Sequence, residues 1–331
     1  MKYDLSIPVT DRSAIFQRYY MRDGFIFQSW NDRPLVFDVL VIRNPANAVG
    51  NTVGYPISTR TFDEHIELVK SEGIERVEII ADDLSFIAEC PSVKSISVFP
   101  PFFTGNGYDY SPLYNMKQIE RLSCRTSYGD SFEYSSSIDY SKIKGLKSLS
   151  ACGKGHLNYA ELPLLERLFV SNDNKSKSFY DMCCSTELKD LTILQCGIKT
   201  LDGIQRHKKI QSLNLWMNKA LCDVSLLSEL GSSLRSLDIE SCSKITDFSF
   251  LKNLVNLEYL RLCGNNNLPN LSFLNNMMNL KKFSFSMLVE DGDLKPCLNI
   301  PCVYCEKGKK HYNMKDKDLP KQRGIEKFTV K

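Results

Sequence analysis

The sequence of 331 residues predicts an α/β solenoid, a curved stack of short repeats in which each repeat adds one strand to a parallel concave sheet. An apolar frame, L-x-x-L-x-L, recurs every 19 to 27 residues between residues 74 and 305. After several of these frames, apolar residues continue at every third position, which is the period of short 3₁₀ turns on the convex side. Together, the frame and this period predict one strand and one turn per repeat.

Residues 1–72 do not follow the frame, and we expect them to form a small α/β cap that covers the first repeat. Residues 24–30 and 34–42 are rich in β-branched and aromatic residues and predict strands. The alternative is an independent catalytic domain, but this region shows no nucleophile–base pair and no glycine-rich phosphate loop.

Residues 61–73 predict a helix at the end of this cap region. Thr61 and Glu64 have the spacing of a capping box, and Gly73 is typical of the residue that ends a helix. His65 has acidic neighbours on this helix, and we expect its side chain to be exposed. The apolar face should hold Phe62, Ile66 and Val69.

The clearest frames are four segments that each read L-x-x-L-x-L-x-x-(N/C). They are LKDLTILQCGI, IQSLNLWMNKAL, LRSLDIESCSKI and LEYLRLCGNNNL, beginning at Leu188, Ile210, Leu234 and Leu257. This pattern resembles the leucine-rich repeat. In that family the ninth residue points inward and hydrogen-bonds the backbone of the turn. Here the ninth residues are Cys196, Asn218, Cys242 and Asn265.

Cysteine suits the ninth position because it is small and tolerates burial. We therefore expect Cys196 and Cys242 to be reduced structural thiols and most of the twelve cysteines to be unpaired. His207 takes an apolar slot, which predicts a partly buried structural histidine. The period-three runs resemble the internalin type of bacterial leucine-rich repeat. One run comprises Leu268, Leu271, Leu274, Met277 and Leu280.

Six weaker frames extend the array to ten units, and residues 300–305 predict an eleventh strand. Cys302 should point outward there and Cys305 inward, because strand residues alternate between faces. This alternation argues against a zinc site, although Cys297, Cys302, Cys305 and His311 have suitable spacing. We expect neither a metal nor another cofactor. The six frames begin at Ile74, Val93, Ile119, Leu146, Leu165 and Leu280.

The predicted organisation is a cap region over 1–72, the solenoid over 73–306, and a C-terminal cap and basic tail over 307–331. Residues 306–309 predict a turn and residues 310–313 a return strand that covers the last sheet edge. Residues 307–331 carry nine Lys or Arg against three acids, so contact with a phosphate backbone is an alternative to a solvated tail.

The exposed positions of the central strands predict a binding site on the concave face. Trp216 matters most, because exposed aromatics flanked by charge are typical of binding hot spots. Stray surface aromatics are the alternative, since they are common. The site would comprise Arg167, Phe169, Asp190, Leu194, Asn214, Trp216, Asp238, Glu240, Tyr259 and Arg261.

Two long units, beginning at Val93 and Ile119, predict a second site where their extra residues follow the strand. These insertions are rich in Tyr, Phe, Ser, Gly and Asp, as antibody loops are. Flexible filler is the alternative. This loop edge would use Phe102, Phe103, Tyr108, Tyr110, Tyr128, Phe132 and Tyr134.

The resulting prediction is a non-catalytic recognition protein that binds another protein through the concave face and the aromatic loops. One alternative is a glycan- or small-ligand-binding protein that uses the loops of residues 100–140. Another is an enzyme subunit whose solenoid recruits substrate, although no catalytic pair is visible in the sequence.

The net charge of +3 and the lack of an 18-residue apolar run point neither to nucleic acid nor to a membrane. We expect a monomer. The missing leader and the unpaired cysteines predict a cytoplasmic protein, or an exported one if a leader has been removed.

Overall fold

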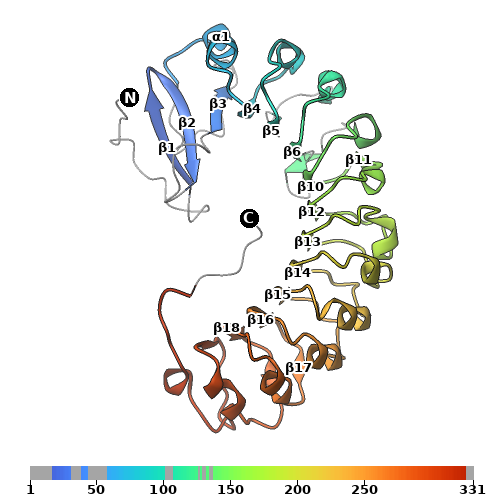
Figure 1. The fold of residues 1–331 in the computed structure, drawn as a ribbon, viewed down its shortest axis with the longest axis vertical. Helices are drawn as coiled ribbons and strands as arrows, with labels where there is room; N and C mark the ends of the chain where they lie inside the picture. The colour runs from blue at the N-terminus through green and yellow to red at the C-terminus, as the bar shows by residue number, and fades with distance from the viewer. Residues whose placement is uncertain are drawn as a thin grey trace. The chain divides into compact units, whose positions relative to one another are not determined.

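The computed structural model describes residues 17–30, 39–43, 58–100, 107–125, 127–128, 132–133 and 137–325. The chain forms two compact units, Met1–Asn158 and Tyr159–Lys331. From β4 onward, the strands of the main sheets alternate with short 3₁₀ turns in both units (Figure 1). The predicted pairing of one strand with one turn is therefore confirmed for the described repeats.

The main sheet of the first unit begins with a hairpin and continues as a parallel ladder. Strand β1 pairs antiparallel with β2, and β2 with β3, whereas every later pair is parallel. The strand order is β1 (Gln17–Arg22), β2 (Phe25–Trp30), β3 (Val39–Arg43), β4 (Arg76–Ile80), β5 (Ser95–Val98), β6 (Arg121–Arg125) and β10 (Ser148–Cys152). The predicted strand over 24–30 is β2, and β3 confirms the part of the prediction over 34–42 that begins at residue 39, whereas residues 34–38 lie outside the described residues.

Strand β1 was not predicted, although the sequence carries its signal. Asp23 and Gly24 join β1 to β2, with φ of 52° and 85°. A two-residue hairpin turn requires positive φ at both residues, which makes Asp-Gly a common sequence for it.

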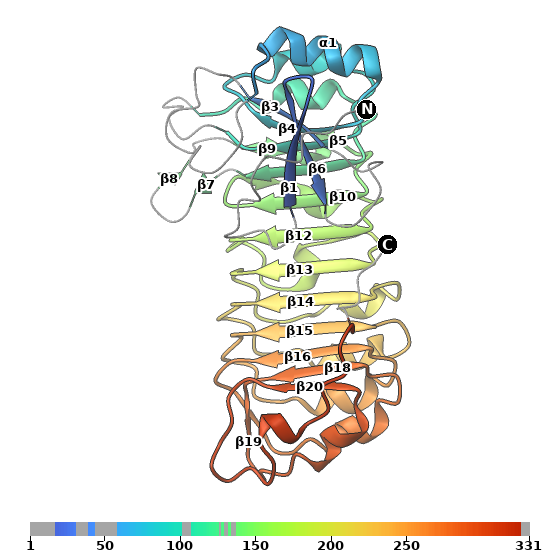
Figure 2. The same cartoon turned by 90° about the vertical axis from the view of Figure 1, so that its left-hand side faces the viewer.

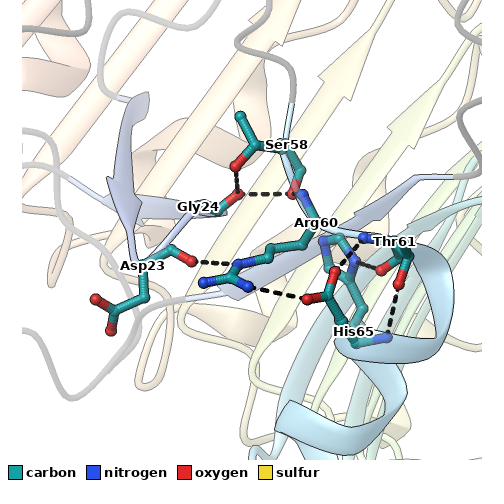
Figure 3. A network of polar contacts seen from close by, with 8 residues as sticks. Asp23, Gly24, Ser58, Arg60, Thr61 and His65 are labelled. Carbon is teal, nitrogen blue, oxygen red and sulfur yellow. Dashed lines mark hydrogen bonds and ion pairs between the residues drawn. The ribbon is translucent and has the colours of Figure 1, made fainter.

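Helix α1 (Phe62–Glu72) follows the sequence prediction closely at both ends. Thr61 and Glu64 form the capping box, and Gly73 ends the helix with φ of 63°. Arg60 ties the helix to the hairpin turn, because its Nε donates to Asp23 O at 2.6 Å and its Nη1 to Glu64 Oε1 at 2.9 Å (Figure 3). Ser58 Oγ adds a hydrogen bond to Gly24 O at 2.8 Å.

The expected exposure of His65 is wrong, because its side chain is fully buried. His65 and Val69 lie one turn apart on the inward face of α1. The imidazole meets the Phe25 ring edge-on, with the two ring centres 5.0 Å apart. Its Nδ1 lies 2.6 Å from Thr61 O (Figure 3). The acidic neighbours of His65 did not predict which face of the helix it occupies.

The second unit holds a wholly parallel sheet, whose strands run side by side (Figure 2). Leu237, Ile239, Leu260 and Leu262 are fully buried, as predicted. The order is β12 (Arg167–Ser171), β13 (Asp190–Leu194), β14 (Ser212–Trp216), β15 (Ser236–Glu240), β16 (Tyr259–Cys263), β18 (Lys282–Phe285) and β20 (Cys302–Cys305). Strand β20 is the predicted eleventh strand.

Short strand pairs and 3₁₀ turns complete both units. The pairs are β7 (Ser127–Tyr128) with β8 (Phe132–Glu133), β9 (Ile138–Asp139) with β11 (His156–Leu157), and β17 (Asn267–Leu268) with β19 (Leu288–Val289). The 3₁₀ turns are Ser85–Glu89, Ser111–Asn115, Tyr140–Lys142, Tyr159–Glu161, Phe179–Asp181, Ile204–Arg206, Ser225–Leu230, Ser249–Asn253, Ser272–Asn276, Lys295–Asn299 and Asp316–Asp318.

The inward ninth residues of the second unit bond the turn backbone. Asn218 accepts from Cys196 N at 2.9 Å and donates to Ile193 O at 2.8 Å. The thiol of Cys242 lies 3.4 Å from Leu215 O. These contacts confirm the inward position for Cys196, Asn218 and Cys242.

The fourth ninth residue is Asn266 and not Asn265. Asn266 is buried and donates to Cys242 O at 3.1 Å and to Ile245 O at 2.7 Å, whereas Asn265 is exposed. Gly264 follows β16 with φ of 147° and adds one residue before the inward position. The ninth residue from Leu257 therefore lies one position before the inward asparagine.

All twelve cysteines are free thiols, as predicted for most of them. Burial raises the pKa of Cys196 to about 12 and that of Cys242 to about 11. A thiol with so high a pKa is a poor nucleophile at neutral pH. The structural histidine prediction also holds, since His207 is buried with its Nδ1 2.8 Å from Ser185 O.

The last sheet edge is covered, but not by the predicted return strand over 310–313. Cys302 instead forms an antiparallel bridge with Lys321, and Val303 N donates to Pro320 O at 2.9 Å. Proline has no N–H to return to Val303 O, and the Lys321 ammonium donates there instead. Residues 311–313 contact the turn before them, where Asn313 N donates to Gly292 O at 3.0 Å.

Candidate functional site

The candidate site lies on the open face of the second unit's sheet, which we define as the face opposite the 3₁₀ turns. The strands are in register, so the side chains of this face form three rows. The first row is Arg167, Asp190, Ser212, Ser236, Tyr259, Lys282 and Cys302; the second is Phe169, Thr192, Asn214, Asp238, Arg261, Ser284 and Tyr304; the third is Ser171, Leu194, Trp216, Glu240 and Cys263. All ten predicted concave-face residues belong to these rows.

Three of the predicted residues are less exposed than expected. Asp238 is 3% exposed, and Asn214 and Tyr259 are each 7% exposed. Neighbouring strands lie about 4.8 Å apart, so a long side chain covers a shorter one beside it. Arg261 lies over Asp238 in this way, with Nη1 3.3 Å from Asp238 Oδ1.

Arg261 is the centre of an acidic cluster formed by Asp238, Glu240 and Glu306. Its Nη1 lies 2.5 Å from Glu240 Oε2, and its Nε lies 3.6 Å from Glu306 Oε1. Burial alone would lower the pKa of Arg261, but the bond to Glu240 and the charge of Asp238 raise it above its ordinary value. One guanidinium thus faces three carboxylates, so the cluster favours a cationic partner.

Apolar side chains lie beside the acidic cluster. Trp216 and Leu194 are register partners in the third row, and both are partly exposed. Tyr304 is 43% exposed, and the Lys321 ammonium lies 4.4 Å from the centre of its ring. Sequence reasoning missed Tyr304 and Glu306, although Tyr304 occupies the same place in its frame as Arg261.

The predicted loop edge loses two of its aromatic side chains to the interior. Tyr108 and Tyr110 are buried, with ring centres 5.0 Å apart. Tyr110 begins a period-three run into the repeat core that continues through Leu113 and Met116. The prediction that these two rings are exposed is therefore wrong.

The other loop residues remain a prediction. Phe102, Phe103 and Tyr134 lie outside the described residues, and only the backbone is described for Tyr128 and Phe132. That backbone forms the antiparallel pair of β7 and β8.

The zinc-like spacing does not bring its four residues together as a ligand group. Cys302 pairs in register with Lys282 and Cys305 with Phe285, so the two thiols occupy opposite faces of β20, as predicted. Cys302 is nevertheless buried, because the chain at Lys321 covers it. Within the described parts of the chain, no three His, Cys, Asp or Glu side chains are grouped so as to hold a metal ion.

Comparisons with known proteins find similarity in fold. No family model matches the sequence, and no curated protein matches it significantly. Among solved structures, the chain resembles an internalin, InlF, of Listeria monocytogenes, with 14% identity over 81% of this chain and 79% of that one and a TM-score of 0.40. The functional domain of InlJ from the same organism gives 16% identity, and the match covers 66% of this chain and 50% of that one, with a TM-score of 0.42.

A leucine-rich-repeat protein of Leptospira interrogans gives 13% identity over 75% of this chain and 81% of that one, with a TM-score of 0.34. At such identities the likeness concerns the fold alone. No helix in the described ranges has the length and apolar character needed to cross a membrane. The recurring frame, the parallel strands and the 3₁₀ turns give this chain a leucine-rich-repeat solenoid fold.

Proposed function

We propose that this chain is a non-catalytic recognition protein that binds another protein on the open face of the second unit. The observation that carries this proposal is that apolar side chains and carboxylates lie next to each other on one sheet. Trp216 and Leu194 offer apolar surface, and the carboxylates around Arg261 lie on the next strands. Aromatic anchors beside charge are typical of protein-binding surfaces.

The chemistry of this face selects the kind of partner. Glu240 and Glu306 keep about a third of their side-chain surface exposed, so they remain accessible to a cation. An apolar or aromatic ridge would cover Trp216, while Lys or Arg beside it would approach the two glutamates. Complementary charge of this kind increases the rate of association and fixes the orientation of the partner.

The loop-based alternative, glycan or small-ligand binding over residues 100–140, loses support from the burial of Tyr108 and Tyr110. A sugar-binding aromatic needs an exposed ring on which the sugar can stack. We therefore propose the sheet of the second unit, and not the loops, as the recognition surface.

The test uses the change Trp216→Ala. The intact chain captures its partner from a native lysate, and the captured protein is then purified for titration against both forms. We expect the change to weaken binding by about 2 kcal/mol, roughly thirty-fold, because a hot-spot aromatic is removed. The thermal midpoint should change little, because a partly exposed side chain leaves no closed cavity.

Met278→Ala is the matched control. Met278 is 87% exposed and lies on the opposite side of the repeat, just after the 3₁₀ turn Ser272–Asn276. The change Met278→Ala removes apolar surface without altering the open face, so the variant should bind the captured protein with the affinity of the unchanged chain. Equal binding by Trp216→Ala and the unchanged chain would refute the proposal.

A further inference from the structure

The first unit has a hollow on the side of its 3₁₀ turns that the proposed function does not use. The volume of this hollow is about 350 Å³, at the lower end of the roughly 300–1,000 Å³ that is usual for a small-ligand site. It lies beside the turns Ser111–Asn115 and Tyr140–Lys142 of two neighbouring repeats. Lys117, Lys142 and Lys144 line it, and no carboxylate belongs to its described wall.

The positive charge of this hollow is only partly compensated. All three lysine side chains are exposed, and none of them forms an ion pair in the described part of the chain. The charge of Asp139 attracts Lys142 from a longer distance, but its carboxylate accepts hydrogen bonds from Ser141 and Asn158. The hollow therefore attracts anions.

Two of the lysines occupy the same place in neighbouring repeats. Lys117 precedes the frame residue Ile119 by two positions, and Lys144 precedes the frame residue Leu146 by two positions. No other two consecutive frames of the sequence both have a lysine at this place. Like charges stacked in this way repel each other, and an anion bound between them would relieve the repulsion.

A second column of charges in the same repeats is arranged differently. At the position that follows each frame anchor, acids and lysines alternate, so that Glu75 pairs with Lys94, and Glu120 pairs with Lys147 at 3.0 Å. Opposite charges in neighbouring repeats can stabilise the folded chain without a ligand. The stacked lysines cannot do so, and residues that depart from such a rule are expected at functional sites.

Tyr114 positions one of the three ammonium groups. Its hydroxyl accepts a hydrogen bond from Asp139 N at 3.0 Å, which orients the ring. The Nζ of Lys142 lies 4.8 Å from the centre of this ring, within the range of a cation–π interaction. An ammonium group that is already positioned loses less conformational freedom when an anion binds.

We propose that Lys117, Lys142 and Lys144 bind the phosphate groups of a small phosphorylated molecule. An ammonium group is a compact charge with three donors and no fixed plane, so it suits phosphate oxygens, which point in several directions. A phosphate monoester carries a charge of about −2 at pH 7, whereas a carboxylate carries a single charge. Three ammonium groups around one hollow therefore favour phosphate over carboxylate.

The hollow has room for the group that carries the phosphate. Met116 and Ile143 supply a small apolar part of its wall. The Ser141 hydroxyl donates to Asp139 Oδ1 at 2.7 Å, and its oxygen can still accept a hydrogen bond from a ligand. The ligand class is therefore a phosphate ester on a compact carrier that has a hydroxyl group.

The experiment titrates the full chain with pyrophosphate, inorganic phosphate and acetate at constant ionic strength, followed by calorimetry and by NMR of the lysine Cε–H signals. We expect pyrophosphate to bind at least about ten-fold more tightly than acetate, with phosphate between them, because attraction increases with the charge of the anion. Lys117→Gln and Lys144→Gln should each weaken pyrophosphate binding about three- to five-fold, as is usual for an exposed charge pair. The double variant should bind about ten-fold more weakly or less.

Two control variants separate the hollow from general charge effects. Lys144→Arg keeps the positive charge, so it should bind pyrophosphate within about two-fold of the unchanged chain. Lys244→Gln removes an exposed lysine of the second unit and should leave the affinity unchanged. Thermal midpoints equal to that of the unchanged chain will show that all these variants are folded.

Pyrophosphate that binds no more tightly than acetate, or that binds the double variant as well as the unchanged chain, would overturn the proposal. Binding of a single-stranded oligonucleotide without binding of pyrophosphate would also overturn it, in favour of a nucleic-acid backbone. These failures are separable from failure of the protein-binding proposal. Trp216→Ala should retain pyrophosphate, and the double lysine variant should retain the captured protein.

Discussion

The open face of the second unit is filled by large side chains, with Trp216 beside Leu194 and Arg261 held among carboxylates. The open face of the first unit is covered by serines with Arg76 and Arg121 at their side. Both faces rest on the same L-x-x-L-x-L frame, whose leucines are buried in both units. The frame therefore fixes the scaffold and leaves the intervening residues free to differ in chemistry between the two units.

The strongest way to break this comparison is to change a frame residue. Leu260 is fully buried, between Leu237 and Phe283 of the neighbouring strands. We expect Leu260→Ala to lower the free energy of unfolding by about 2–5 kcal/mol, because it removes buried surface and leaves a cavity. Urea unfolding followed by circular dichroism measures the loss.

Ser123→Ala is the control for that change, because it alters an intervening residue of a frame, on β6 of the first unit. It should change the free energy of unfolding by no more than about 0.5 kcal/mol. Similar losses from the two changes would show that frame and intervening residues do not divide their roles in this way.

A second comparison concerns the inward asparagines. Asn218→Ala would leave Cys196 N–H and Ile193 C=O without their partner inside the repeat. We expect a loss of about 2–3 kcal/mol in the free energy of unfolding, since buried polar groups without partners are costly. Hydrogen exchange of the Cys196 amide should also become faster.

Asn265→Ala serves as the counterpart, because the sequence frame points to Asn265 whereas the structure places Asn266 inward. It should be close to neutral, and Asn266→Ala should resemble Asn218→Ala. A costly Asn265→Ala with a neutral Asn266→Ala would reverse this assignment.

The smallest expected effect is a pH dependence carried by His207. Burial lowers its pKa below the ordinary 6.5, so the unfolded chain binds more protons than the folded chain. The stability that this histidine contributes is thus complete above pH 6.5 and is lost as the pH falls toward its folded pKa, by up to about 1.4 kcal/mol per pH unit.

His207→Leu gives this position the residue that Leu254 supplies in a later repeat. Unfolding at pH 7.5 and 5.5 should show a smaller pH effect in His207→Leu than in the unchanged chain. The second unit gives the cleaner test, because in the first unit the raised pKa of Glu78 opposes that of His65. An unchanged pH effect in His207→Leu would contradict the prediction.

The sequence predicted the repeating part of the fold because its signal is periodic. Each described strand from β4 onward in the main sheets begins two residues after its frame anchor, as Tyr259 does after Leu257. The positions of single residues that do not follow this period were harder to predict. Gly264 shifted the inward asparagine by one position, and His65 faced the core although its neighbours are acidic.

The candidate site was predicted in position but not in exposure. The alternation of side chains along a strand predicts which face of the sheet a residue occupies. It does not predict which side chains of the neighbouring strands cover that residue. Asp238 was placed on the correct face and is covered by Arg261. Tyr110 is the first residue of its period-three run, and all its apolar partners in that run follow it in the sequence. The sequence prediction therefore placed Tyr110 in the loop and not in the run.

The short cap over β20 has a consequence for how far the sheet can extend. The edge strand of a parallel sheet has unpaired backbone groups, to which any exposed strand with the same frame could add. Here Pro320 and Lys321 occupy that edge, and an ammonium group supplies the donor that proline lacks. Because this cap occupies the edge, the backbone groups that a further strand would need are already covered on that side.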